Sequence, residues 1–337
     1  MGSWSLCSDH IIVTATDAGS AILAPLPPHE ASLFVGSMRL FPLVFVVLSL
    51  SLTSGCSIKQ LALNAVADEL SGGTGGSFTE DPDLQFIGEA LPFGLKLMES
   101  INDATPKHVA MKQTLASGFT QYAVVFVEWP ATQLKYSNYE EHRAGLKRAK
   151  TFYLRAHNYA LDGLDLIHAD FRSRLYEDTD ALLAEMTVAD TPLLFWMSAS
   201  LLAAASTDLE DPSMFGAFPL AAKAMQRAYE LDPTWSGGLI PSTLISVEPN
   251  LPGSGGTERA EARYEEALAL SEGRSAGVHV SLATAVALKT QDKERFVELL
   301  NKSLELSLDD DPDNRLSNDY AQQKARFLLE HLDDMFL

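Results

Sequence analysis

Helical spacing of apolar residues governs almost the whole chain beyond residue 80, and it restricts the folds open to this sequence. Alternating apolar and polar residues never run long enough to predict a sheet. The best strand candidate, Leu244–Val247, we interpret as helix or loop. A first helix should end at Pro130, and one of its faces carries Leu115, Phe119, Tyr122 and Phe126. The pattern predicts an all-α fold.

Two further helices have recognisable starts. Ser137 with Glu140 fits a capping box, which opens a long helix. Asp190 can cap another helix that has Pro192 in its first turn. This second helix is apolar nearly all round from Leu193 to Ala205, so we expect it at the centre of the fold.

Similar segments recur in the second half of the chain. Residues 224–233 match the ending of the second helix of a tetratricopeptide repeat, and residues 264–270 and 300–306 repeat the pattern at intervals of about 39 and about 36. A weaker copy covers residues 95–106. We expect degenerate tetratricopeptide-like repeats packed in one compact α-α domain. An irregular helical bundle is the alternative.

Residues 38–56 have the organisation of a lipoprotein signal peptide. Arg39 supplies a positive charge, and residues 40–52 form an apolar stretch too short to span a bilayer. The sequence Thr-Ser-Gly-Cys that ends at Cys56 resembles a lipobox, although Thr53 stands where Leu is preferred. We expect cleavage before Cys56 and lipid on its thiol. A buried N-terminal helix with an ordinary core cysteine is the alternative.

Four segments follow from this interpretation. Residues 1–37 are a mis-annotated upstream extension, 38–55 the signal peptide, 56–80 the lipidated cysteine with a flexible glycine-rich tether, and 81–337 the helical domain. The net charge of −20 falls to about −18 after cleavage. Such acidity excludes nucleic acid as a partner, because no basic surplus can displace counterions from phosphates.

Five residues are candidates for contact with a ligand. Gly118 interrupts a helix that also presents Gln121 and Tyr122, and either close packing or a passing ligand can account for a glycine there. Trp196 and Ser200 lie one turn apart on the apolar helix and could form an aromatic wall with a polar rim. The alternative for Trp196 is an ordinary core tryptophan.

No arrangement of residues predicts an enzyme, a metal site or a cofactor. The loop Leu251–Thr257 lacks the Gly-Lys-Ser/Thr ending of a phosphate loop, so we expect a connection followed by a helix capped by Thr257. The acidic run Asp309–Asp313 would place Tyr320 where a calcium loop needs glutamate, so we expect a solvated loop. No Ser/His/Asp or Cys/His pattern is legible.

Several stretches resemble the TatT family, the tetratricopeptide-like lipoproteins associated with TRAP transporters. The resemblance extends from about residue 55 to the C-terminus and is carried by Ser54–Lys59, Ala90–Phe93, Leu115–Ala123, Asp190–Trp196, Leu251–Gly256 and Asp333–Leu337. It implies a periplasmic, non-enzymatic homotrimer whose protomers each enclose a channel. It also implies docking of a periplasmic TRAP solute receptor that handles hydrophobic ligands such as carboxylates.

The function expected from this resemblance is that of an accessory component of a TRAP-type transport system. Ser57, which follows the lipidated cysteine, favours the inner leaflet of the outer membrane, because Asp at that position favours retention in the inner membrane. The alternative is a helical repeat scaffold for envelope protein assembly that binds no ligand.

Overall fold

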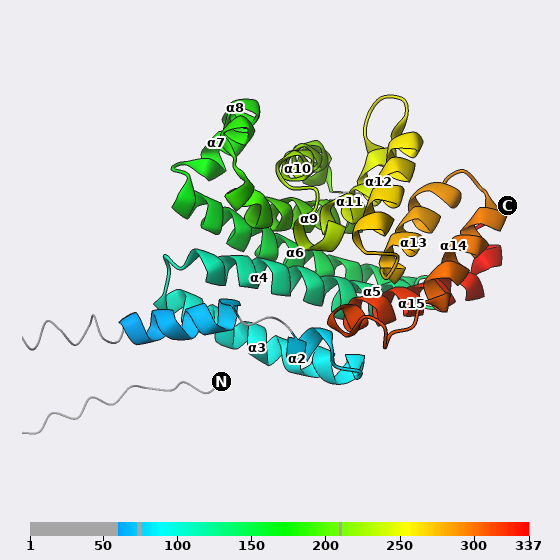
Figure 1. Cartoon of the computed structure of the whole chain (residues 1–337), viewed down its shortest axis with the longest axis horizontal. Coiled ribbons are helices and arrows are strands. Elements are labelled where there is room, and N and C mark those ends of the chain that lie inside the picture. Colours follow the sequence, from blue (N-terminus) through cyan, green and yellow to red (C-terminus); the bar gives the residue numbers. More distant parts are fainter. Residues whose placement is uncertain (1–59, 73–75, 209–210, 337) are drawn as a thin grey trace, which may run out of the picture. The chain divides into compact units, whose positions relative to one another are not determined.

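The computed structural model describes residues 60–72, 76–208 and 211–336, and every regular element in these ranges is helical (Figure 1). The all-α prediction is confirmed for this part of the chain. The predicted extension, the signal peptide and Cys56 lie outside the described residues.

The N-terminal part of the described chain is more regular than a tether. Residues 60–72 form a helix, and α2 (Gly76–Thr79) follows before α3 (Leu84–Ala104). Ala67 is buried, the Gln60 side chain donates to the Ala104 carbonyl at 3.1 Å, and Asp68 lies 2.8 Å from the His108 ring. The expected flexible segment therefore includes a helix that packs on the domain.

Pro130 does not end the helix that precedes it. α4 (Val109–Tyr122) continues through a π-helical turn, η1 (Ala123–Glu128), into α5 (Trp129–Gln133). Pro130 is the second residue of α5 and comes directly after the π turn. The predicted end at Pro130 is wrong, because the π turn changes the hydrogen-bond register before the proline is reached.

α6 (Tyr139–Ile167) is the longest described helix, and its cap differs by one residue from the prediction. Asn138, not Ser137, is the last non-helical residue, and its side-chain oxygen accepts from the Glu141 N–H at 3.3 Å. Serine and asparagine both cap helices well, so the backbone conformation decided that Asn138, and not Ser137, caps α6. The chain then forms α7 (Phe171–Glu177) and α8 (Thr179–Glu185).

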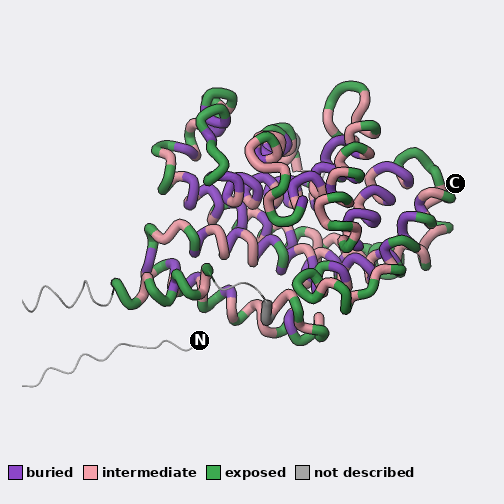
Figure 2. The backbone as a smooth tube through the Cα atoms, in the orientation of Figure 1, coloured by how far each residue is buried: buried purple, intermediate pink, exposed green. Residues whose placement is uncertain are grey.

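α9 (Thr191–Thr207) follows the turn η2 (Val188–Asp190) and is central, as expected. It packs against α4, α6 and α10 and is mostly buried (Figure 2). The helical stretch Val188–Thr207 is long and apolar enough to cross a membrane, and a buried core helix has the same length and composition. Asp190 precedes α9, yet its carboxylate turns back to the Thr187 N–H at 2.8 Å.

The C-terminal half consists of helices that pack in consecutive pairs, α9 with α10, α11 with α12 and α13 with α14. The three predicted repeat segments lie on α10, α12 and α14, the second helix of each pair. Whether these pairs are degenerate tetratricopeptide units stays a prediction. The bounds are α10 (Pro212–Leu231), α11 (Trp235–Val247), η3 (Glu248–Asn250), α12 (Gly256–Leu270), α13 (Ala276–Leu282), η4 (Ala283–Ala287), α14 (Lys293–Glu305), η5 (Pro312–Asn314), α15 (Arg315–Glu330) and η6 (Leu332–Asp334).

Two local expectations in this half have different outcomes. Leu244–Val247 is helical, as predicted. Thr257 does not cap α12, because Gly255 in the left-handed conformation (φ 80°) precedes the helix and Thr257 already lies in its first turn. Glycine adopts positive φ without steric cost, so it turns the chain into the helix there.

Candidate functional site

An apolar cavity of about 580 Å³ lies between residues 69–71 and 78–79, α3 and α4. Its volume falls within the range of small-molecule sites, roughly 300 to 1,000 Å³. α3 contributes a wall of aliphatic and thioether side chains, and α4 contributes short polar ones. The main wall residues are Ile87, Leu91, Leu95, Met98, Thr114, Ser117 and Phe126.

Gly118 and Gln121, two of the five predicted ligand residues, line this apolar cavity. A Cβ atom at Gly118 would lie 2.8 Å from a methyl carbon of Leu95, so the glycine also lets α3 approach α4 closely. The sequence left two explanations open for Gly118, close packing and contact with a ligand. In the structure Gly118 both packs closely and lines the cavity. Gln121 is exposed and places an amide at the edge of the apolar wall.

The other three predicted residues lie elsewhere. Tyr122 is buried in an aromatic cluster, with its ring centroid 5.4 Å from that of Phe152. Trp196 packs against Phe195 at 4.9 Å, and the buried Ser200 hydroxyl donates to the Trp196 carbonyl at 2.6 Å. The structure therefore brings Gly118 and Gln121 together and separates them from the pair on α9.

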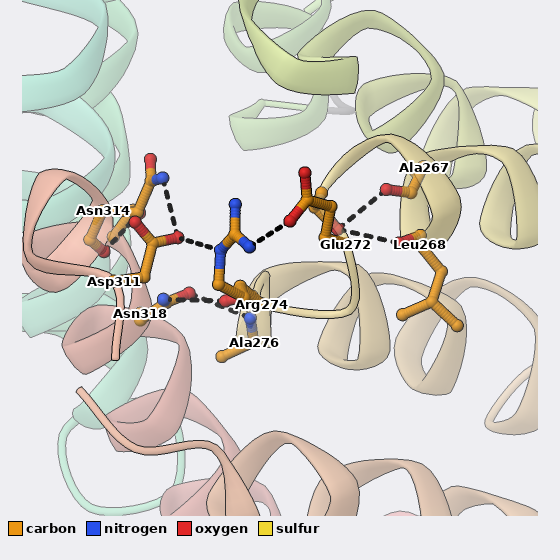
Figure 3. A network of polar contacts seen from close by, with 10 residues as sticks. Ala267, Leu268, Glu272, Arg274, Ala276, Asp311, Asn314 and Asn318 are labelled. Carbon is orange, nitrogen blue, oxygen red and sulfur yellow. Dashed lines mark hydrogen bonds and ion pairs between the residues drawn. The ribbon is translucent and has the colours of Figure 1, made fainter. Parts of the chain in front are cut away.

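A second cavity, of about 340 Å³, has a mostly polar lining and lies among α11, α13 and α15. Figure 3 shows the polar network at its rim. Arg274 bonds to Glu272 and reaches Asp311, with 3.6 Å between Nε and Oδ2. The Asn318 amide donates to the Arg274 carbonyl and accepts from the Ala276 N–H, each at 2.9 Å, which fixes the loop before α13.

The deeper wall of the polar cavity carries Tyr320 and Lys324, which lie one turn apart on α15. Both side chains are enclosed deep in the protein, yet both keep some accessible surface because they face the cavity. Burial lowers the pKa of the Lys324 ammonium, while the negative charge of Glu128 acts in the opposite direction. Burial also raises the pKa of the Tyr320 hydroxyl.

Glu128 lies behind this wall, in the π turn η1. Its carboxylate accepts a hydrogen bond from the Tyr153 hydroxyl of α6. Burial raises the pKa of Glu128, although Tyr153 and the charge of Lys324 both lower it. The pKa of Tyr153 is raised in turn, by burial and then by Glu128. Glu128 and Tyr153 thus interact with Tyr320 and Lys324, which line the polar cavity.

Sequence reasoning missed this group, and one signal could have revealed it. Glu128 ends a run of apolar residues, Ala123 to Val127, which is where a buried charge can be suspected. Lys324 gives no such signal, because a lysine on an amphipathic helix is usually solvated. Its meeting with Glu128 depends on tertiary packing across about 200 residues of sequence.

The two loops considered earlier hold no additional site. Arg259 ties the Leu251–Thr257 loop together, since it donates to the Ser254 carbonyl at 2.9 Å and to buried Glu248 at 2.6 Å. In the acidic run, Asp311 pairs with Arg274 at the cavity rim and Asp309 pairs with Arg315. Among the described residues, no group of three or more His, Cys, Asp or Glu side chains could hold a metal.

Comparisons with known proteins found one matching family and one similar protein. A sequence profile for the TRAP transporter T-component family matches residues 80–336. An uncharacterized protein of Treponema pallidum (strain Nichols) is 26% identical over 312 residues, which cover 87% of this chain and 97% of that protein.

Proposed function

This chain belongs to the TRAP transporter T-component family, and from that premise we propose that it is a periplasmic lipoprotein that docks a TRAP solute receptor and binds the apolar part of that system's ligand. Its role is accessory to transport. Lipid on Cys56 holds it at the membrane, in the inner leaflet of the outer membrane, and the working form is a homotrimer.

The apolar cavity is the observation that supports ligand binding most directly. Aliphatic side chains of α3 line it, Phe126 borders it, and it is large enough for a small hydrophobic molecule. Burial of an aliphatic chain there would contribute about 25 cal/mol for each Å² removed from water. The polar side chains of α4, Gln121 among them, would orient the other end of such a ligand.

Native mass spectrometry of protein purified from its own cells tests this proposal. We expect a co-purified lipophilic molecule in the wild type and its loss in Gly94→Leu. Gly94 lines the cavity, and an added Cβ would meet no atom within 4 Å, so a leucine side chain can fill the space without a backbone clash. Gly216→Leu on α10 is the matched control, because its Cβ also has open space but lies outside this cavity.

A second experiment tests docking of the receptor. Crosslinking in cells followed by affinity purification should recover a periplasmic TRAP receptor with the wild type. If neither a lipophile nor the receptor accompanies the protein, the transport proposal fails, and a scaffold without a ligand becomes the better explanation of the helical pairs.

A further inference from the structure

Lys324 is a half-buried cation for which the described part of the chain supplies no direct partner. Its ammonium forms no hydrogen bond and no ion pair there, and only the longer-range charge of Glu128 acts on it. A lysine that is largely enclosed by protein is rarely left in this condition, because a charge removed from water without a partner is costly. The side chain faces the polar cavity, which is where a compensating anion could enter.

Tyr320 adds a second unused donor at the same place. It lies four residues before Lys324 on α15, so the two side chains share one face of the helix. Its ring is held edge-on against Trp129, with 6.0 Å between centroids, while its hydroxyl has no hydrogen-bond partner among the described residues. The ring is thus positioned by packing and the hydroxyl is left available.

Two more hydroxyl groups converge on the cavity from other helices. Ser242 of α11 and Ser281 of α13 line it, and neither hydroxyl has a hydrogen-bond partner in the described structure. Besides the ion-paired Arg274 and Asp311 at its rim, the cavity thus gathers one cation that has no ion-pair partner among the described residues, together with several neutral donors. Leu239 and Val280 are apolar neighbours.

The charge of Glu128 limits which anion fits. Its carboxylate is engaged by Tyr153 and remains close enough to act on Lys324. A second negative charge in the cavity would be repelled by Glu128 without a second free cation to offset it, since Arg274 already bonds to Glu272 and Asp311. A monoanion satisfies this arrangement better than a phosphate dianion.

We propose that the cavity among α11, α13 and α15 binds the carboxylate of a short-chain organic acid, with Lys324 and Tyr320 as its direct ligands and aliphatic side chains around its tail. This site is separate from the apolar cavity beside α4. Carboxylate binding here can therefore be tested independently of lipophile binding there.

Isothermal titration calorimetry with the wild-type protein tests the proposal, with sodium butanoate, hexanoate and phosphate as probes at fixed ionic strength. We expect saturable binding of a carboxylate, at least tenfold weaker binding in Lys324→Met, and several-fold weaker binding in Tyr320→Phe. Lys223→Met is the control, since Lys223 is an exposed α10 residue paired with Asp180, and its affinity should equal that of the wild type.

Thermal unfolding of the same variants separates loss of the site from loss of the fold. Lys324→Met removes an unpaired, half-buried charge and retains a side chain of similar length, so we expect its Tm to equal or exceed that of the wild type. The proposal is overturned if neither carboxylate binds, if phosphate binds more tightly than both, or if the Lys324→Met and Tyr320→Phe variants bind as well as the wild type.

Discussion

His279 shows how burial sets the charge state of a single residue. The imidazole is buried on α13, and the Tyr264 hydroxyl lies 3.0 Å from its Nδ1. Burial, and then the positive charge of Lys302, lower the pKa of His279 to about 4. Between pH 6.5 and 4 the unfolded chain takes up a proton at this histidine while the folded chain does not, so folding stability falls as the pH falls through this window.

We expect this one histidine to account for a loss of up to about 3 kcal/mol between pH 6.5 and pH 4. In His279→Gln, which keeps an acceptor for Tyr264, that part of the pH dependence should disappear. Urea unfolding at several pH values measures it. His331→Gln serves as the control, and an unchanged slope in His279→Gln would contradict the assignment.

Gly145 on α6 lies where this helix packs closely against α5. A Cβ atom there would lie only 2.4 Å from the Cβ of Ala131, and neither atom can move without its backbone. Gly145→Ala should therefore lower the unfolding free energy by about 1 to 3 kcal/mol. Gly216→Ala, at an open helical position, should instead raise it by up to about 1 kcal/mol.

The double variant Gly145→Ala with Ala131→Gly tests whether this contact is the cause. It moves the methyl group from one helix to the other, so most of the stability lost in Gly145→Ala should return. Urea denaturation of both single variants and the double variant completes the cycle. Additive losses would mean that the helices do not meet at this point.

At the scale of elements, the start of α11 depends on a run of left-handed residues. Gly237 (φ 65°) and Gly238 (φ 87°) both have positive φ, but only Gly238 is crowded, with an added Cβ lying 2.8 Å from the Cβ of Leu270 on α12. Gly237→Ala should cost about 1 kcal/mol of stability from backbone strain, and Gly238→Ala should cost about 1 to 3 kcal/mol more. Chemical denaturation of the two variants gives the ordering.

A third variant checks the cause. Gly237→Asn should be close to neutral, because asparagine tolerates the left-handed region. Equal costs for alanine at Gly237 and Gly238 would show that α12 does not press on this turn.

Helices were predictable from the sequence as elements, whereas their ends and registers were less so. The centrality of α9 followed from the apolar surface all round it. The boundary predictions at Pro130 and Ser137 were wrong, because a π turn precedes the proline and Asn138, a residue that also caps well, follows the serine. Several neighbouring residues can begin or end a helix by their type alone, and the packing of the folded chain decides which of them does so.

For the whole molecule, the proposed anchor at Cys56 predicts covalent lipid. Cells fed labelled palmitate should label the wild-type protein, and Cys56→Ala should lose the label and accumulate as uncleaved precursor, because the thiol carries the lipid. Ser57→Ala, next to the cysteine, is the matched control and should label normally, because it leaves the thiol in place. Persistent label in Cys56→Ala, or a mature N-terminus other than Cys56, would overturn the assignment.

The sequence alone determined the helical class, the apolar central helix and the family, because periodicity and motif are local properties that survive without knowledge of contacts. It also selected Gly118 and Gln121, which do lie at a cavity, though through an argument that left packing equally open. Only the tertiary structure brought Glu128, Tyr153, Tyr320 and Lys324 together, since three helices distant in sequence supply them. Burial created their shifted pKa values, and burial is a property of the folded chain.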